Sequence, residues 1–250
     1  MEQIALISDL HANLPAVEAV FDDIFKRDIK RIFCLGDFVG KGAKPDEVIT
    51  LCRKYCELSV YGNWDDFLLR SGKHENPIQW YIDRISEENV KYLESLPRVI
   101  EFYLSSKTVR LFHAHPFDVY RRLYDTSDKK RVEEMFEYDI CDLEFKYDKK
   151  SDIVGYGDIH HAFIRFEDDR LFFNTGSVGN PLDGLSASYA ILEGEYGLKE
   201  TAPYSAKIVR VPYDIKKAVS DIKNSDMPQK ERYIKEIETG KFFGRIMGRL

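Results

Sequence analysis

Short apolar runs alternate with longer amphipathic stretches along most of this chain. The clearest runs end at Gly, Asp, Asn or His, and they include QIALISD, RIFCLGD, ELSVYGN, TVRLFHAH and SDIVGYGDIH. Runs of this length, rich in Ile, Val, Leu and Phe, predict buried strands, and several are followed by segments with helical spacing. RLFFNTGS, SYAIL and AKIVRVPYD add β-like runs in the C-terminal half. The alternation predicts a layered α/β fold.

The clearest helix is predicted directly after Asn13, a residue type that favours the N-cap position. From there, apolar residues recur at spacings of three and four and so fall on one helix face. These residues are Leu14, Val17, Val20, Phe21, Ile24 and Phe25. The pattern predicts an amphipathic helix that covers one side of the sheet.

We expect one domain over residues 1–250, since no repeat, low-complexity tract or composition shift indicates a linker. Helical insertions are predicted at 70–100 and at 118–147, where the second is highly charged and mostly helical in pattern. A helical, charged tail is predicted over 214–250. We expect this tail to pack on the edge of the domain.

Composition narrows the classes of partner. The 250 residues include 43 Asp and Glu against 37 Lys and Arg, a formal net charge of -6, which argues against binding to long nucleic acids. No apolar stretch approaches the roughly 20 residues that cross a bilayer, and the start MEQIALISDL lacks signal-peptide features. We therefore expect a cytoplasmic protein that does not enter membranes. The sequence indicates no oligomeric state.

Residues that can bind metal ions follow five of the strand-like runs. They are Asp9 and His11 after ALIS, Asp37 after FCLG, Asn63 after SVYG, His113 after VRLF, and Asp158 and His160 after IVGYG. In open α/β sheets the loops at the carboxyl edge converge on one crevice, so these residues can meet. Alternate residues of an extended segment point the same way, which lets Asp9 and His11 reach one ion.

The set of ligands suggests a pair of ions. Seven candidates exceed the needs of one tetrahedral zinc ion, and a mixture of imidazole, carboxylate and amide suits Mn²⁺, Fe or Zn²⁺ better than Ca²⁺. Two metals roughly 3.5–4 Å apart would clamp a phosphoryl group and generate a hydroxide between them. The residues alone therefore predict a centre with two divalent ions, an arrangement that is able to act on a phosphoryl group.

The motifs SDLHAN, LGDFVG, YGNWDD, the lone His113 and YGDIHH resemble, in order and context, those of the calcineurin-like metallophosphoesterases. NTGSVGNPLDG, residues 174–184, and the following SYAIL resemble the loop and strand after the site in the small bacterial and archaeal phosphodiesterase branch. The resemblance covers most of the chain. It implies a β-sandwich flanked by helices, which is a four-layer αββα sandwich.

The resemblance also implies roles for individual residues. Asp9, His11 and His160 would hold the first metal, Asn63, His113 and Asp158 the second, and Asp37 would bridge the two. The expected cofactor is a pair of divalent ions, with Mn²⁺ first and Fe, Zn²⁺ or Mg²⁺ as alternatives. Asn63 would also reach the substrate phosphate, and Asn13 is a candidate contact for it.

Asp158 departs from the family pattern, because most relatives have histidine there. An aspartate can still bind a metal, and we expect it to make the second site richer in oxygen, favouring Mn²⁺ or Mg²⁺. Its added negative charge would make a metal-bound water less acidic. The alternative is that Asp158 forms local hydrogen bonds and the second metal is weak or absent.

Trp64 is a second departure, since it stands where the widespread family motif has a histidine that assists phosphoryl transfer. An indole cannot transfer that proton, which favours leaving groups that are already stable anions. The ring could stack on a base, and YGNWDD is similar to a segment of asymmetric diadenosine tetraphosphate hydrolases. This resemblance implies a nucleotide substrate such as a dinucleoside polyphosphate. Alternatively, Trp64 packs into the core behind Asn63.

Other side chains are candidates for acid catalysis and phosphate binding. His115 and His161 each follow a proposed ligand closely, and either could protonate a leaving group if it faced the site. Asp65 and Asp66 could include a residue that orients a metal-bound histidine. Arg121 and Arg122 could meet a substrate phosphate, although we favour a solvated helix face for them.

The leading hypothesis is a two-metal hydrolase of phosphodiester or phosphoanhydride bonds, in which a hydroxide between the metals attacks phosphorus. The expected substrate is a small phosphate ester or nucleotide. A phosphoprotein phosphatase is the alternative enzyme, because the same scaffold serves that chemistry. A non-catalytic scaffold, like retromer-type relatives of this fold, is the alternative outside the enzymes.

Overall fold

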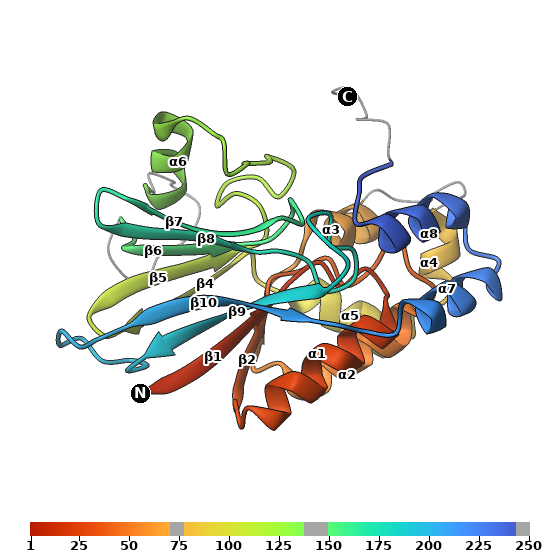
Figure 1. Ribbon diagram of the computed structural model, residues 1–250, viewed down its shortest axis with the longest axis horizontal. Coiled ribbons are helices and arrows are strands. Elements are labelled where there is room, and N and C mark those ends of the chain that lie inside the picture. The colour runs from red at the N-terminus through yellow and green to blue at the C-terminus, as the bar shows by residue number, and fades with distance from the viewer. Residues whose placement is uncertain (71–77, 138–149, 244–250) are drawn as a thin grey trace.

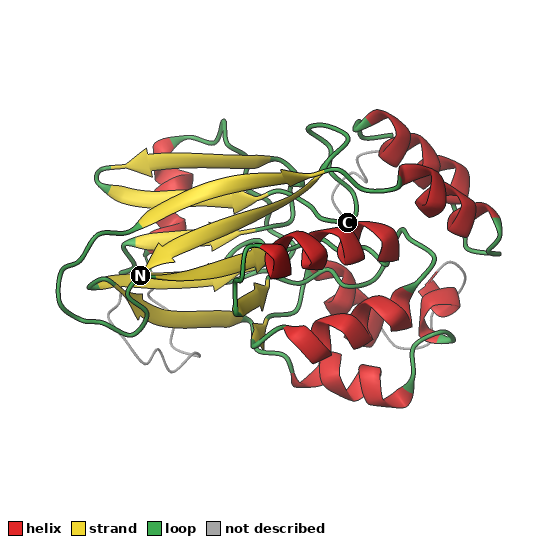
Figure 2. Ribbon diagram, turned by 60° about the horizontal axis from the view of Figure 1, so that its bottom comes forward, coloured by secondary structure: helices red, strands yellow, loops and turns green. Residues whose placement is uncertain are grey.

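Two stacked β-sheets form the centre of the molecule, and helices cover their outer faces (Figures 1 and 2). The computed structural model describes residues 1–70, 78–137 and 150–243. Each sheet has five strands. The order of layers is helices, sheet, sheet, helix, so the four-layer αββα sandwich that the sequence predicts is confirmed.

The first sheet has the strand order β10-β9-β1-β2-β3. Its strands are β1 (Glu2–Ile7), β2 (Arg31–Cys34), β3 (Leu58–Ser59), β9 (Ala187–Gly194) and β10 (Ser205–Val211). The first three run parallel, with Leu6 beside Phe33 and Phe33 beside Leu58, while β9 runs antiparallel to β1 and β10. The carboxyl ends of β1, β2 and β3 therefore lie at one edge.

The second sheet has the order β4-β5-β6-β8-β7. Its strands are β4 (Val99–Leu104), β5 (Lys107–Phe112), β6 (Ile153–Tyr156), β7 (Ala162–Glu167) and β8 (Arg170–Thr175). Strands β5, β6 and β8 are parallel, and the edge strands β4 and β7 are antiparallel to their neighbours. This sheet also directs several carboxyl ends to one edge.

Apolar side chains fill the space between the sheets. Leu6 and Phe33 from the first sheet belong to the same fully buried cluster as Leu111 and Phe173 from the second. The rings of Phe33 and Phe102 meet edge to face with their centroids 5.7 Å apart. Because both sheets bury this common face, their strand ends are held at fixed positions relative to one another.

Most helices cover the outer face of the first sheet. They are α1 (Leu14–Lys26), α2 (Pro45–Tyr55), α3 (Asn63–Arg70), α4 (Ile78–Ile82), α5 (Glu87–Ser95), α7 (Ile215–Lys223) and α8 (Lys230–Thr239). The helix α6 (Lys129–Phe136) packs on the second sheet, with Val132, Met135 and Phe136 in a buried cluster. Figure 1 shows α6 apart from the other helices.

The predicted first helix is confirmed as α1, and the Asn13 side chain accepts a hydrogen bond from the N–H of Ala16 as its N-cap. Phe25, expected on the buried face, is 45% exposed at the end of that face. In the tail, α7 and α8 pack against each other and α7 packs against α1. Residues 244–250 of the predicted tail lie outside the described chain.

The segment 118–147 differs from its prediction. Its described part forms one helix, α6, while 118–128 run as loop and turns, and 138–147 lie outside the described residues. The charged residues of 118–128 make ion pairs and turns in place of a helix, as between Arg121 and Glu134. The interpretation of Arg121 and Arg122 as a solvated helix face is therefore wrong. In the predicted insertion 70–100, α4 and α5 are present, and 71–77 are not described.

Among the described residues, we find no helix with the length and apolar character that crossing a bilayer requires.

Candidate metal centre

The carboxyl ends of parallel strands from both sheets meet at one end of the sandwich. Loops that follow β1 and β2 carry Asp9, His11 and Asp37, and loops that follow β5 and β6 carry His113 and His160. All of these side chains are buried. The convergence expected of parallel strands thus brings residues up to 151 positions apart in the sequence into two small groups, which share Asp9.

The loops need unusual backbone conformations. Five of the proposed ligands have a positive φ: Asp9 (54°), His11 (46°), Asp37 (57°), Asp158 (67°) and His160 (60°). The left-handed region costs energy for side chains with a Cβ and is entered several times more often by Asn, Asp and His than by other non-glycine residues. Such clustering is typical of sites where the surrounding structure imposes the geometry.

Backbone hydrogen bonds join the loops after β1 and β2. The N–H groups of Leu10 and His11 both donate to the carbonyl of Asp37, at 2.9 Å each. The Asp65 carboxylate then accepts hydrogen bonds from the N–H groups of Asp37 (2.8 Å) and Phe38 (3.0 Å). These contacts set the backbone before any metal binds.

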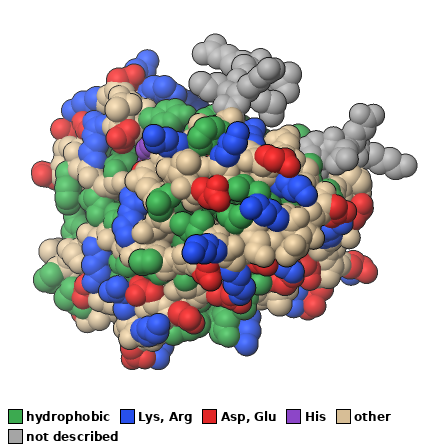
Figure 3. Space-filling model, turned by 45° about the vertical axis from the view of Figure 1, so that its right-hand side comes forward, with side chains coloured by type: hydrophobic (Ala, Val, Ile, Leu, Met, Phe, Trp, Pro, Cys, Tyr) green, Lys and Arg blue, Asp and Glu red, His purple; other side chains and the backbone are tan. Residues whose placement is uncertain are grey.

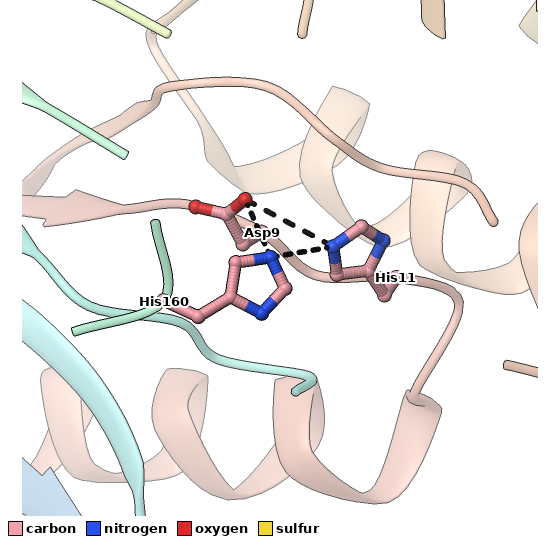
Figure 4. A group of neighbouring side chains, drawn as sticks. All are labelled: Asp9, His11 and His160. Atoms are coloured by element: carbon pink, nitrogen blue, oxygen red, sulfur yellow. Dashed lines mark hydrogen bonds and ion pairs between the residues drawn. The ribbon is translucent and has the colours of Figure 1, made fainter. Parts of the chain in front are cut away.

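Asp9, His11 and His160 form the first group of ligands, shown in Figure 4. Nε2 of His11 lies 3.0 Å from Nε2 of His160, and the latter lies 3.2 Å from Oδ1 of Asp9. The three side chains point toward one another from the loop after β1 and the loop after β6. Their facing atoms are those that a single ion would contact.

Hydrogen bonds fix the tautomers of both imidazoles. Nδ1 of His11 lies 3.0 Å from the carbonyl of Val39, and Nδ1 of His160 lies 2.6 Å from the carbonyl of Asn180. A carbonyl only accepts, so each Nδ1 carries the proton and each Nε2 keeps its lone pair. Two lone pairs 3.0 Å apart repel each other unless a cation lies between them. The pair therefore fits a metal ion, with carbonyls in the orienting role common around metal-bound histidines.

Asp9, Asp37 and His113 form the second group. Nδ1 of His113 donates to the carbonyl of Leu35 at 2.7 Å, so Nε2, which lies 3.4 Å from Oδ1 of Asp37, is the nitrogen that can bind an ion once it has lost its proton. Within the described chain, His113 Nε2, Asn63 Oδ1 and Asp9 Oδ1 are buried atoms with no hydrogen-bond partner. Buried polar atoms are rarely left unpaired, and these are ligand atoms. This group also fits a divalent ion.

The pKa values of the proposed ligands are shifted because several ionisable side chains lie close together and are buried. Burial alone would raise the pKa of Asp9, but the neighbouring imidazoles, His160 foremost, lower it below its usual value. Burial raises the pKa of Asp37 well above its usual value, and the charge of Asp9 adds to this effect. Burial alone would lower the pKa of His113, yet the carboxylates of Asp37 and Asp9 raise it to about 9. Perturbations of this kind are concentrated at functional sites.

Asp158 lies at the edge of this centre and belongs to neither group of facing ligand atoms. Its carboxylate is held by Arg122, whose Nε lies 2.9 Å from Oδ2 and whose Nη2 lies 3.0 Å from Oδ1. The Nδ2 group of Asn63 also donates to Oδ1 of Asp158, at 3.2 Å. Both oxygens of Asp158 are therefore engaged by protein groups, and its role as a metal ligand stays a prediction.

The two candidate acids lie in different surroundings. His115 is buried, its Nδ1 accepts from the N–H of Phe117 at 3.3 Å, and burial together with Arg121 and Arg131 lowers its pKa to about 3. An imidazole that is neutral at pH 7 is a poor proton donor, which argues against the predicted acid role. His161 is exposed next to the buried His160. The structure brings neither side chain into the two ligand groups.

Asn13 and Trp64 were predicted to contact substrate. Asn13 is buried; its Oδ1 caps α1 and its Nδ2 donates to the carbonyl of Gly179 at 2.8 Å, which favours a positioning role. The Trp64 ring is half-buried, and its centroid lies 6.2 Å from that of His11, edge to face. Added at Gly40, a Cβ would lie 2.6 Å from this ring, so glycine makes room for the indole.

Sequence reasoning gave Asp65 a different role and missed Glu236. Asp65 is a predicted partner of a metal-bound histidine, but in the structure it binds backbone N–H groups. Glu236, from α8, accepts a hydrogen bond from Asn180 at 3.0 Å and lies 3.8 Å from Nζ of Lys41. Helical periodicity gives no signal for such contacts, because Glu236 is 56 positions from Asn180.

A two-sheet sandwich with buried imidazoles and carboxylates at its strand ends defines a metal-binding enzyme of the layered α/β class. The family model of the calcineurin-like phosphoesterase superfamily domain matches residues 2–197, and the chain belongs to this superfamily. It is accordingly a metal-dependent phosphoesterase. The resemblance expected from the sequence motifs is thereby confirmed.

The chain is 37% identical over 254 residues to an uncharacterized protein of Methanocaldococcus jannaschii, covering 90% of this chain and 94% of the relative. Its fold is similar to that of a metallophosphoesterase from Sphaerobacter thermophilus, with a TM-score of 0.75 and 24% identity over 96% of this chain and 99% of that one. A hypothetical protein from Pyrococcus horikoshii has a TM-score of 0.76 and 17% identity over 97% and 100% of the two chains. These two structures support the fold.

Proposed function

We propose that this chain is a two-metal hydrolase of phosphodiester or phosphoanhydride bonds in a small, nucleotide-type substrate. The observation that carries the proposal is the pair of buried ligand groups that share Asp9. We assign Asp9, His11 and His160 to one divalent ion, and Asn63, His113 and Asp158 to the other, with Asp37 between them. Mn²⁺ is the ion we expect in both places, given the mixture of imidazole and oxygen ligands.

Divalent ions bound here would supply Lewis-acid activation of the phosphoryl group and of the water that attacks it. The protein's contribution is to hold the ligands in place. Carbonyls orient His11 and His160 through their Nδ1 protons, and the half-buried amide of Asn63 lies beside Asp158 at the edge of the centre. Asn63 is the residue we assign to contact the substrate phosphate.

The choice of bond follows from the lack of a suitable acid in the described part of the site. Trp64 occupies the motif position of the family's histidine, His115 is neutral at pH 7 and His161 is exposed outside the ligand groups. A leaving group must therefore depart without strong help from a protein proton donor. Phosphoanhydrides and aryl esters meet this condition, whereas simple alkyl monoesters do not.

A nucleotide-type substrate is supported by the Trp64 ring. It is partly exposed, meets the His11 ring in a T-shaped arrangement, and lies so near Gly40 that a Cβ at that position would clash with it. A base stacked on such a ring gains roughly 1–3 kcal/mol in comparable contacts. The mixture of basic and acidic side chains on the face shown in Figure 3 suits a small substrate better than a long nucleic acid, which requires a continuous basic surface.

The test is a hydrolysis screen of the Mn²⁺-reconstituted protein. The substrates are a dinucleoside tetraphosphate, a bis-aryl phosphate, an aryl monophosphate and a phosphopeptide, and the products are separated by chromatography. We expect the first two to be cleaved, with unequal cleavage of the dinucleoside tetraphosphate into a nucleoside triphosphate and a monophosphate. Asp9→Asn, which removes a ligand from both groups, is the control. Preferential turnover of the phosphopeptide would overturn the proposal in favour of a phosphoprotein phosphatase.

A further inference from the structure

Arg122 places a guanidinium at the edge of the metal centre. Its Nε and Nη2 groups donate parallel hydrogen bonds to the two carboxylate oxygens of Asp158, at 2.9 and 3.0 Å. The Asp158 side chain is 2% exposed and that of Arg122 is 46% exposed, so the arginine reaches in from the surface to a buried carboxylate. A bidentate pair of this kind is among the stronger and more directional interactions between side chains.

Asp158 is tied to the centre on its other side. Its backbone N–H donates to Oδ2 of Asp9 at 3.0 Å, and its Oδ1 accepts from Nδ2 of Asn63. The Oδ1 atoms of Asp9 and Asn63 have no hydrogen-bond partner in the part of the chain that the structure describes. In the second group, Oδ1 of Asp37 accepts from the N–H of Trp64 at 2.9 Å and lies 3.4 Å from Nε2 of His113. The carboxylate of Asp158 differs from these ligand atoms because it is paired with a guanidinium.

The guanidinium of Arg122 changes the number of positive charges that the carboxylates of the centre can balance. Asp9, Asp37 and Asp158 bring three negative charges when ionised, and one divalent ion together with Arg122 brings three positive charges. A second divalent ion would leave an excess of two positive charges if Arg122 stayed in place. Lys41, which lies close enough to His11 and His160 to influence them, pairs with Glu236 on its other side. Uncompensated charge is costly in a buried site, so the second ion and the arginine oppose each other.

We propose that Arg122 competes with the second metal ion for the carboxylate of Asp158, and thereby sets the affinity of the second site. The inference rests on the proposed two-metal centre. With Arg122 in place, the protein binds one ion tightly and a second one weakly. When the second ion binds, it displaces the guanidinium from Asp158.

The experiment is a titration of the metal-free protein with Mn²⁺. Binding is measured by calorimetry and by the electron paramagnetic resonance signal of free Mn²⁺. Arg122→Gln removes the charge and should tighten the second site at least tenfold while leaving the first within about threefold. Arg121→Gln, at the neighbouring position, breaks the ion pair with Glu134, leaves the pair between Arg122 and Asp158 in place and is the matched control. Asp158→Asn should weaken the second site and make it insensitive to Arg122→Gln.

An unchanged affinity of the second site in Arg122→Gln would overturn the inference and leave the metal centre intact. If Arg122→Gln fails to fold, Arg122→Lys replaces it, because lysine keeps the charge but loses the two-pronged grip, and it should tighten the second site by a smaller factor. Failure of the proposed function looks different. In that case Mn²⁺ binds with the expected dependence on Arg122, and yet no phosphate ester is hydrolysed.

Discussion

The carboxylate of Asp65 accepts a 2.8 Å hydrogen bond from the backbone N–H of Asp37, 28 positions earlier in the chain. The same carboxylate accepts from the N–H groups of Phe38 and Gly62. One buried side chain at the start of α3 therefore fixes both the loop after β2, which carries Asp37, and Gly62, which directly precedes Asn63. The shape of the metal centre depends on a residue outside both ligand groups.

Asp65→Asn should destabilise the protein. An amide can accept from some of the three N–H groups but presents its own N–H₂ to the others, and a buried donor left unpaired costs about 1–3 kcal/mol. We expect the free energy of unfolding, measured in urea, to fall by about 2–4 kcal/mol. Asp22→Asn, on the exposed side of α1, should change it by less than about 0.5 kcal/mol. Equal stabilities of the two variants would show that the loops hold their shape without Asp65.

Binding of divalent ions should raise the thermal stability. An ion that binds only the folded state adds roughly 2.7 kcal/mol at a concentration 100 times its Kd. For a chain of this size, each kcal/mol raises the Tm by about 2–4 °C. We expect Mn²⁺ to produce such a shift in differential scanning calorimetry, and EDTA to reverse it.

Substitutions of individual ligands should show how much each group contributes to the rise in Tm that Mn²⁺ produces. Asp9 belongs to both groups, so Asp9→Asn should abolish the stabilisation by Mn²⁺. His160→Asn leaves Asp9, Asp37 and His113 in place and should retain a smaller shift. The same shift in Asp9→Asn as in the unaltered protein would mean that the metal binds elsewhere.

Glu236→Gln should destabilise the protein through Lys41. Glu236 is 1% exposed and lies 3.8 Å from Nζ of Lys41 and 3.3 Å from Nε of Arg232. Glutamine can still accept from Asn180, but it removes the carboxylate that pairs with the largely buried ammonium group of Lys41, and breaking a buried pair costs about 3–5 kcal/mol. Glu238→Gln, exposed on the same helix, is the matched control for unfolding in urea. The idea fails if both substitutions have the same small effect.

Asp46 should contribute to the pH dependence of stability. Burial alone would raise the pKa of Asp46, but hydrogen bonds from the N–H of Ser86 and the amide of Asn89, both 2.7 Å long, lower it. Its stabilising effect is therefore complete above the unfolded pKa of about 3.9 and is lost as the pH falls through the lower folded value. The difference in unfolding free energy between the wild type and Asp46→Asn should shrink from pH 6 to pH 3. A constant difference would contradict this account.

The alternation of apolar runs predicted a layered α/β fold, and the resemblance of the motifs implied its four layers. Most of the centre could be predicted for a physical reason. The residues that follow parallel strands lie at one edge of the sheet, so the sequence alone predicts that Asp9, His11, Asp37, His113 and His160 meet. What it could not predict is the partner of Asp158. Arg122 approaches from an irregular segment 36 positions away, and loops that lack a periodic pattern give no indication of where their side chains point.

The charged segment 118–128 is a second case in which sequence pattern did not predict the structure. Its composition suggested a helix, yet a short irregular path brings Arg122 to the centre and leaves Arg121 beside Glu134. Helix propensity is a weak preference that tertiary contacts override, and here an ion pair with a buried carboxylate is such a contact.

The left-handed backbone of five proposed ligands narrows the amino acids that can replace them. Asp, Asn, His and Gly enter that conformation with the least strain, and three of these four types also carry metal-binding atoms. The backbone conformation and the binding of a metal therefore favour nearly the same set of amino acids at these positions. A mutational scan with alanine would combine two losses, the ligand and about 1–2 kcal/mol of backbone preference. Asparagine separates them, and a library restricted to these four residues would explore different metal preferences without first breaking the loops.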